Sequence, residues 1–276
     1  MISGELFQSL AEVGLYSEMT DLISNQIRSM PQILIKMSDL APKDIKKYKV
    51  VYVYTQFLTD FFDRYFDELN DGTILISHNS DLGIHQNSHK YLECNKIKAW
   101  YCQNRETSHP KLFSIPIGLA NSQWPHGNQQ LIENIRKANN KKDILVFKNF
   151  DINTNYGERL LCNIATSNNG ISMSPSQSLD NYWTTLSRSV FIISPPGNGI
   201  DCHRIWEALC LRCVPIVKKH EAFLQFLHLP ILFIDDWNQV TVDFLMHKSK
   251  EFLGVDHKIP ELEIEFWKEK IQYDKR

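Results

Sequence analysis

Arg204 and Glu207 have the chemistry and the spacing to bind a nucleotide together. They are three residues apart, so on a helix they lie on the same face, one turn apart. A guanidinium forms forked hydrogen bonds with phosphate oxygens, and a carboxylate accepts hydrogen bonds from a ribose diol. The alternative is that the two side chains pair with each other on a solvated helix. The segment that precedes them favours nucleotide binding.

This segment reads as a buried strand over 190–194, a Pro/Gly turn, and a helix with Asp201 as a suitable N-cap. Backbone N–H groups and the positive end of the helix dipole would then bind phosphate, and Gly197 and Gly199 would let an anion approach the backbone closely. The glycine pair also fits a dinucleotide fingerprint without its third glycine, so a dehydrogenase is a weak alternative. The predicted binding residues here are Ser194, Pro196, Gly197, Asn198, Gly199, Asp201, His203, Arg204 and Glu207.

Short β-branched or aromatic runs alternate with helical patterns along the chain, which predicts βα units and mostly parallel sheets. The expected strands are 49–54, 73–77, 97–102, 112–117, 144–148, 190–194, 214–218 and 231–235. The main expected helices are 56–69, 156–165, 179–188, 201–211 and 221–227, with closing helices near 240–253 and 261–273. The polar run Asn139–Lys142 is the best boundary, so we expect lobes over 1–140 and 141–276.

Composition excludes several classes of protein. A formal net charge of −2 and no block of basic residues argue against nucleic-acid binding. No apolar run approaches the length of a membrane span, and the N-terminus does not read as a signal peptide. The six cysteines form no framework, and none of the twenty asparagines lies in an N-x-S/T sequon. We therefore expect a cytoplasmic protein.

The stretch 194–217 resembles the C-terminal signature of the exostosin-like glycosyltransferases, family 47. The matching motifs are Pro-x-Gly in 195–197, Arg-x-x-Glu-Ala in 204–208 and Cys-Val-Pro-Ile-Val in 213–217. Segments 76–81, 100–104 and 115–127 are similar to the short soluble members of large DNA viruses, of chlorovirus type, and of bacteria. The sequence departs from the usual pattern at Cys202-His203, before Arg204, and at Leu211-Arg212, before Cys213.

The resemblance implies a GT-B fold: two Rossmann-like lobes with a cleft between them, and closing C-terminal helices. It implies that the C-terminal lobe binds a UDP-sugar, that the N-terminal lobe binds an oligosaccharide or glycoprotein glycan, and that transfer inverts the anomeric carbon. Xylose from UDP-xylose is the expected sugar, since a small pentose needs the least elaborate binding site in a compact protein. A viral member would act in the host cytoplasm. The alternative is an inactive exostosin-like module that binds a glycan or nucleotide.

The expected transferase needs no metal and no other cofactor. Metal-dependent transferases use Asp-x-Asp, and no two aspartates here are two positions apart. Cationic side chains and helix N–H groups must then stabilise the negative charge of the departing diphosphate. Lys148 and Arg159 flank the first loop of the C-terminal lobe and are predicted to reach the phosphates; a solvated helix face is the alternative for Arg159.

A base must take the proton of the acceptor hydroxyl. The candidates are Asp81 and His78, which follow the strand 73–77, and the sequence leaves the choice between them open. For each of them a structural role, such as capping the turn, is the alternative. Asn121 and the loop residue His126 are predicted on the acceptor side.

Overall fold

The protein is an α/β structure made of two compact units. The computed structural model describes residues 1–21, 23–24, 34–255 and 258–275. Contacts between residues that are close in space divide the chain into these units. Unit 1 comprises Met1–Gln123 and Glu263–Arg276, and unit 2 comprises Trp124–Leu262. Each unit contains its own parallel sheet, so the predicted α/β class is confirmed.

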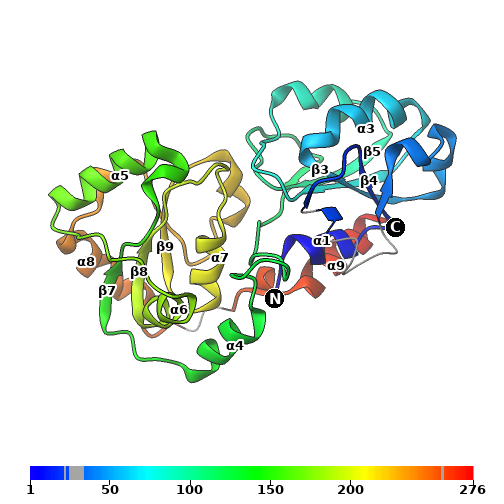
Figure 1. The fold of residues 1–276 in the computed structure, drawn as a ribbon. Helices are drawn as coiled ribbons and strands as arrows, with labels where there is room; N and C mark the ends of the chain where they lie inside the picture. Colours follow the sequence, from blue (N-terminus) through cyan, green and yellow to red (C-terminus); the bar gives the residue numbers. More distant parts are fainter. Residues whose placement is uncertain (22, 25–33, 256–257, 276) are drawn as a thin grey trace. The chain divides into compact units, whose positions relative to one another are not determined.

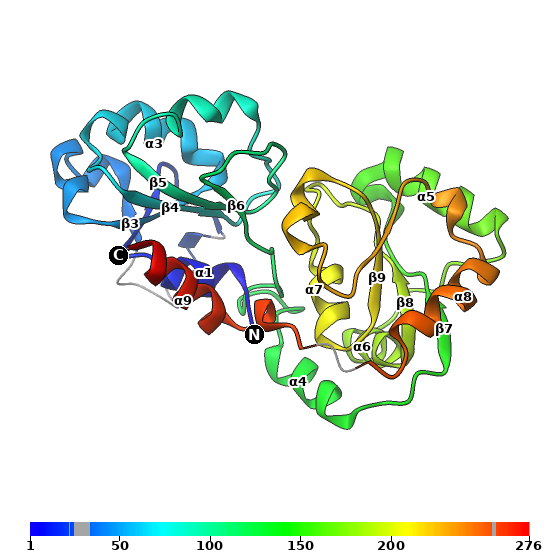
Figure 2. The same cartoon turned by 180° about the vertical axis from the view of Figure 1, so that it is seen from behind.

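Unit 1 is built on a six-stranded sheet of order β2-β1-β3-β4-β5-β6. Helix α3 lies on one face of the sheet, and α1 and α9 lie on the other (Figures 1 and 2). The strands are β1 (Val13–Tyr16), β2 (Leu34–Lys36), β3 (Val50–Tyr54), β4 (Thr73–His78), β5 (Ile97–Cys102) and β6 (Leu112–Ser114), and the helices are α1 (Gly4–Ser9), α3 (Leu58–Tyr65) and α9 (Ile264–Lys275).

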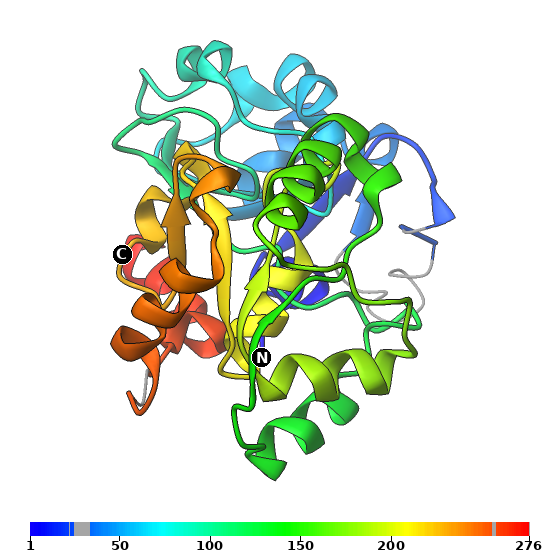
Figure 3. The same ribbon diagram turned by 90° about the vertical axis from the view of Figure 1, so that its left-hand side faces the viewer.

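Unit 2 is built on a four-stranded sheet of order β10-β9-β8-β7. Helices α5 and α8 lie on one face, and α6 and α7 lie on the other (Figures 1 and 3). The strands are β7 (Ile144–Phe147), β8 (Ser189–Ile193), β9 (Val214–Lys218) and β10 (Leu232–Ile234). The helices are α4 (Gln129–Ala138), α5 (Tyr156–Asn168), α6 (Leu179–Arg188), α7 (His203–Cys210) and α8 (Val242–Phe252), with the 3₁₀ segments η6 (Ile152–Asn155), η7 (Glu221–Phe226), η8 (Trp237–Gln239) and η9 (Pro260–Leu262).

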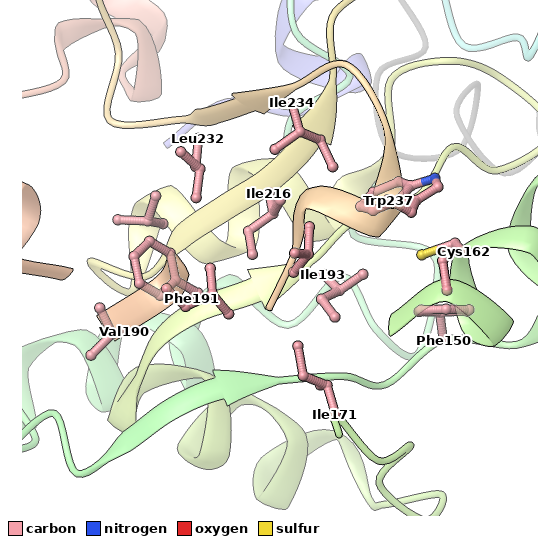
Figure 4. Packing of buried hydrophobic residues seen from close by; sticks show 14 residues of the cluster. Phe150, Cys162, Ile171, Val190, Phe191, Ile193, Ile216, Leu232, Ile234 and Trp237 are labelled. Carbon is pink, nitrogen blue, oxygen red and sulfur yellow. The ribbon is translucent and has the colours of Figure 1, made fainter. Parts of the chain in front are cut away.

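Hydrophobic runs explain why these strands form parallel sheets. Every residue of β3, β4 and β8 is buried, as expected for strands that are covered on both faces. In unit 2, Phe191 and Ile193 of β8 pack with Cys162 of α5 and Leu245 of α8 in one core (Figure 4). This packing holds the carboxyl ends of the strands in fixed positions.

Several element boundaries differ from the sequence prediction. The strand 73–77 extends to His78, and the helix 56–69 is an α-helix only over Leu58–Tyr65, with 3₁₀ turns on both sides. Segment 221–227 is the 3₁₀ helix η7. Strands β1 and β2 were not predicted, because their apolar runs are short.

The lobe boundary expected after Asn140 also differs from the division by contacts. Helix α4 packs against α6 and so belongs to unit 2. Helix α9, expected in the C-terminal lobe, packs against β4 of unit 1, where Trp267 contacts Phe7. The GT-B arrangement and the roles of the two lobes stay predictions.

None of the helices that the structure describes is long and apolar enough to cross a bilayer.

Candidate functional site

The carboxyl ends of β7 and β8 carry the two loops that form the candidate site in unit 2. The loop after β7 contains Phe150 and leads through η6 into α5, and the loop after β8 runs from Ser194 to Cys202 before α7. Phe150 belongs to the core beside Cys162 of α5 (Figure 4), so this side chain anchors the first loop to the core of unit 2. In parallel α/β sheets, this edge is where ligands bind.

Two side chains from the β7 side hold the loop after β8. Arg159 of α5 donates from Nε to the Pro196 carbonyl at 2.8 Å and from Nη1 to the Asp151 carbonyl at 2.6 Å. Asn155 donates to the Gly197 carbonyl at 2.7 Å. A Cβ at Gly197 would lie 3.3 Å from Nη2 of Arg159, a tight contact that a larger residue could make only if Arg159 shifted. Arg159 is thus buried against the loop and is not on a solvated helix face.

Arg204 has unused hydrogen-bonding capacity. Its Nε and Nη1 atoms are buried and have no hydrogen-bond partner among the described residues. Arg204 and Glu207 form no hydrogen bond or salt bridge with each other among the described residues, although the charge of each acts on the pKa of the other. Buried polar groups in proteins are nearly always paired, so these two donors indicate a missing acceptor.

The two arginines lie on either side of one aromatic ring. The guanidinium carbons of Arg159 and Arg204 are 5.9 Å and 5.8 Å from the centroid of Phe150. Burial, and after it the charge of Arg204, lowers the pKa of Arg159. Two neighbouring cations in a partly desolvated place repel each other unless an anion lies between or beside them. The arrangement can therefore bind a multiply charged anion such as a diphosphate.

Glu207 lies one turn further along α7. Burial raises the pKa of Glu207, and the charge of Arg204 opposes this shift. The hydroxyl of Tyr182 on α6 donates to Glu207 Oε2 at 3.3 Å. One carboxylate oxygen is thus oriented by Tyr182, and the group can accept hydrogen bonds from a diol.

Asp201 does not cap the helix, contrary to the prediction. Helix α7 begins at His203 with Cys202 as its N-cap. The buried carboxylate of Asp201 instead accepts the indole N–H of Trp206 at 2.8 and 2.9 Å. This contact fixes the start of α7 from inside, so the first turn of the helix lies two residues later than expected.

Lys148 has a structural role, contrary to the prediction that it binds the donor. Its ammonium is fully buried and donates to Asn163 O, Ser167 Oγ and Ile171 O at 3.1, 2.8 and 3.0 Å. Burial lowers the pKa of Lys148. Because these three acceptors take its three N–H groups, Lys148 joins α5 to the segment after it and has none left for a phosphate.

His78, at the end of β4 in unit 1, does not have the geometry of a base. Its ring is fully buried and stacks on Phe7. Nε2 lies 3.0 Å from the Pro116 carbonyl, and Nδ1 accepts the backbone N–H of Asn79 at 2.7 Å. A carbonyl only accepts, so Nε2 carries the proton and the lone pair of Nδ1 is already engaged.

Asn79 is the centre of a polar network at this edge of unit 1. It has a positive φ of 57° and donates from Nδ2 to the Tyr52 hydroxyl at 2.8 Å. The buried Asn121 donates to Asn79 Oδ1 at 3.1 Å and accepts the backbone N–H of Glu5 at 3.0 Å. Both ends of the Asn121 amide are thus occupied. The side chain of Asp81, by contrast, is exposed.

His126, predicted on the acceptor side, lies in unit 2. Its ring stacks on the exposed Trp124 with an interplanar angle of 13° and meets the ring of His203 at a centroid distance of 6.1 Å. The three aromatic rings therefore extend from the first residue of α7 to an exposed indole. Asn198 is exposed at the tip of the glycine loop.

Sequence reasoning missed Phe150, Asn155 and Tyr182. Asn155 and Phe150 lie in the loop after β7, and the rule that ligands bind at carboxyl strand ends would have included them. Tyr182 is on α6, which no local pattern connects with Glu207. Within the described residues, no three His, Cys, Asp or Glu side chains are grouped so as to hold a metal ion.

Comparison with known proteins supports a glycosyltransferase relationship for this region. Residues 139–261 match the family model of the RXYLT1 C-terminal domain. The matched segment begins directly after α4 and ends within η9, so it contains both loops of the candidate site and α7 but not Trp124 and His126. The match supports a glycosyltransferase-related, xylosyltransferase-like family for this segment. No curated protein matches the chain.

Proposed function

We propose that the protein is an inverting, metal-independent glycosyltransferase that uses a UDP-sugar, with xylose as the first choice of sugar. The observation that carries the proposal is the pair of buried, unpartnered nitrogens of Arg204 beside Arg159. A diphosphate supplies the missing acceptors and neutralises both cations. The family match over residues 139–261 supports the same class of reaction.

In this proposal, the side chains of unit 2 bind the nucleotide and stabilise the leaving group. Arg204 donates from Nε and Nη1 to phosphate oxygens, and Glu207 accepts hydrogen bonds from the ribose hydroxyls. Charge builds up on the diphosphate as the bond to the sugar breaks. Donors that are already in place stabilise that charge without reorganising. Arg159 contributes charge and keeps the Pro196–Gly197 loop in position.

The chemical step forms one bond and breaks one. The acceptor hydroxyl oxygen bonds to the anomeric carbon, the bond from that carbon to the phosphate oxygen breaks, and UDP leaves with the electron pair. The hydroxyl proton passes to a base. Asp81 is the proposed base, since its carboxylate is exposed while the lone pair of His78 is engaged.

The proposed acceptor is an oligosaccharide or a glycoprotein glycan. Trp124 and His126 offer aromatic faces of the kind that pack against the apolar face of a sugar ring. Action in the cytoplasm is part of the proposal and is supported by six cysteines that are all free thiols.

Slow hydrolysis of the donor tests the proposal without knowledge of the acceptor. The protein is treated with EDTA and incubated with UDP-xylose, UDP-glucuronic acid, UDP-galactose or UDP-N-acetylglucosamine, and released UDP is measured. We expect release in EDTA, fastest from UDP-xylose, and much slower release by Arg204→Ala. The control Arg188→Ala removes an exposed arginine that pairs with Asp143 in the same unit, and should match the wild type.

Each other outcome has a defined meaning. UDP binding without release from any donor would indicate an inactive binding module. Activity that is lost in EDTA and restored by manganese would contradict metal independence. Faster release from another donor would replace xylose and leave the transferase proposal in place.

A further inference from the structure

A pocket of about 400 Å³ lies at the carboxyl ends of β8, β9 and β10 in unit 2. Its lining includes Ser194, which follows β8, and Lys218, the last residue of β9. Ser194 is 2% exposed, and its Oγ is buried with no hydrogen-bond partner among the described residues. A buried hydroxyl without a partner, in the wall of a pocket of this size, indicates a polar ligand.

The pocket adjoins the proposed diphosphate site. Pro196 lines the pocket, and its carbonyl accepts the Nε–H of Arg159. Glu158, another lining residue, directly precedes Arg159 on α5. A ligand whose phosphates contact Arg159 and Arg204 would therefore extend its next group into this pocket.

The charges of the pocket balance. Lys218 Nζ lies 3.4 Å from Glu158 Oε2, and Lys219 Nζ lies 2.9 Å from Asp235 Oδ1. All four residues line the pocket, so each cation has a carboxylate of its own. Ammonium groups donate, carboxylates accept, and the Ser194 hydroxyl does both. This set suits the hydroxyls of a neutral sugar, whereas a uronic acid would bring its carboxylate next to Glu158 or Asp235.

We propose that this pocket holds the transferred sugar, and that Glu158 and Asp235 make it selective for neutral over anionic sugars. The inference rests on the proposed use of a UDP-sugar and adds the residues that set the class of sugar. Removing one carboxylate while keeping its lysine leaves a cation free for a uronic acid. Glu158 is the better target, because its pair with Lys218 is less exposed than the pair of Lys219 with Asp235.

The test is a change of donor preference in Glu158→Gln, which has nearly the shape of glutamate. The ratio of UDP release from UDP-glucuronic acid to release from UDP-xylose should rise about tenfold, because a lysine then pairs with the sugar carboxylate. Asp235→Asn should shift the ratio in the same direction by less, and the double variant should shift it most. Glu251→Gln is the matched control, since Glu251 pairs with Lys248 on α8 outside the pocket, and should leave the ratio unchanged.

UDP alone separates this inference from the proposed function. Calorimetry should give a Kd for UDP that is the same within about twofold in the wild type and in Glu158→Gln, since this change leaves the arginines in place. Ser194→Ala should weaken UDP-xylose more than UDP. If UDP binds and the donor ratio stays the same in the double variant, the pocket does not select the sugar. If UDP does not bind the wild type, the proposed function fails and the inference fails with it.

Discussion

The carboxyl edges of the two parallel sheets differ in the polar side chains that follow their strands. In unit 1, Asn79, Asn121 and His78 bond to one another or to nearby backbone groups. In unit 2, Arg204 and Ser194 bury donors that have no partner among the described residues, and two arginines lie beside one ring. Both edges follow parallel strands, so the strands alone do not determine whether an edge binds a ligand.

The difference shows how a binding edge can be distinguished from a structural one. An unpaired buried donor costs about 1–3 kcal/mol, so it persists when a ligand repays that cost. The network around Asn79 gains its stability within the folded chain, and it holds Asn79 in a left-handed conformation that is uncommon for residues other than glycine. Unit 1 also buries polar atoms without a partner, among them Thr55 Oγ1 directly after β3, so it is the pair of arginines beside Phe150 that leads us to propose the donor site in unit 2. In unit 1 we propose a chemical role only for the exposed Asp81.

The largest effect should come from Asp81→Asn. If Asp81 is the base, UDP release from UDP-xylose should fall about 100-fold or more, because general base catalysis is lost. The affinity for UDP, measured by calorimetry, should not change, since the proposed nucleotide site lies in unit 2. Asp60→Asn changes an exposed aspartate of α3 in the same unit and should behave as the wild type. Normal turnover of Asp81→Asn would show that Asp81 is not the base.

A second effect concerns stability and the loop of unit 2. Arg159→Ala leaves the carbonyls of Pro196 and Asp151 without their donors and should lower the free energy of unfolding by about 1–3 kcal/mol in urea titrations. Arg159→Lys keeps the charge but loses the fork, so it should recover little of this stability. The exposed Arg188→Ala should cost under about 1 kcal/mol. An Arg159→Ala protein as stable as the control would show that Arg159 does not hold the loop.

The smallest expected effect is a pH dependence of the affinity for UDP, which should come from Glu207 and not from the arginines. Burial raises the pKa of Glu207, so the carboxylate takes up a proton at a pH above the usual range for glutamate. As the pH falls through this raised pKa, the ribose loses its acceptor and the affinity for UDP should drop. Glu207→Gln should bind UDP more weakly at neutral pH and lack this part of the pH dependence. Both UDP affinities, of the wild type and of Glu207→Gln, are measured between pH 5 and pH 8, about the range in which buried carboxyls titrate. Titration of the nucleotide phosphate affects both proteins equally, so it does not change the ratio of the two affinities. A ratio that is constant with pH would contradict a role for the carboxylate.

Most of the fold of unit 2 could be predicted from the sequence. Strands β7, β8 and β9 are apolar runs between turn signals, and α5 and α6 have clear helical spacing. Strands β1 and β2 of unit 1 could not be predicted, because three or four residues carry too little pattern. Local propensity also does not show that α9 returns to unit 1, since a contact such as Trp267 with Phe7 joins distant segments.

The site was partly predictable for the same reason. The spacing of Arg204 and Glu207 placed them on one helix face, and the structure keeps both on α7. The roles of Asp201 and Lys148 depend on partners that no local pattern indicates. Asp201 accepts from Trp206, and Lys148 donates to the Ser167 hydroxyl and to the carbonyls of Asn163 and Ile171. A cation or carboxylate next to a glycine loop could be a ligand or a brace, and only its hydrogen-bond partners distinguish the two.

The most direct test of the account compares uridine with UDP on the wild type and on Arg204→Ala. The account predicts that the wild type binds UDP far more tightly than uridine, and that Arg204→Ala loses about 1.5–3 kcal/mol of UDP binding with little change for uridine. Isothermal titration calorimetry measures both affinities, and circular dichroism checks that the variant is folded. Equal UDP affinity in the folded variant and the wild type would show that the unpaired nitrogens of Arg204 do not bind a diphosphate.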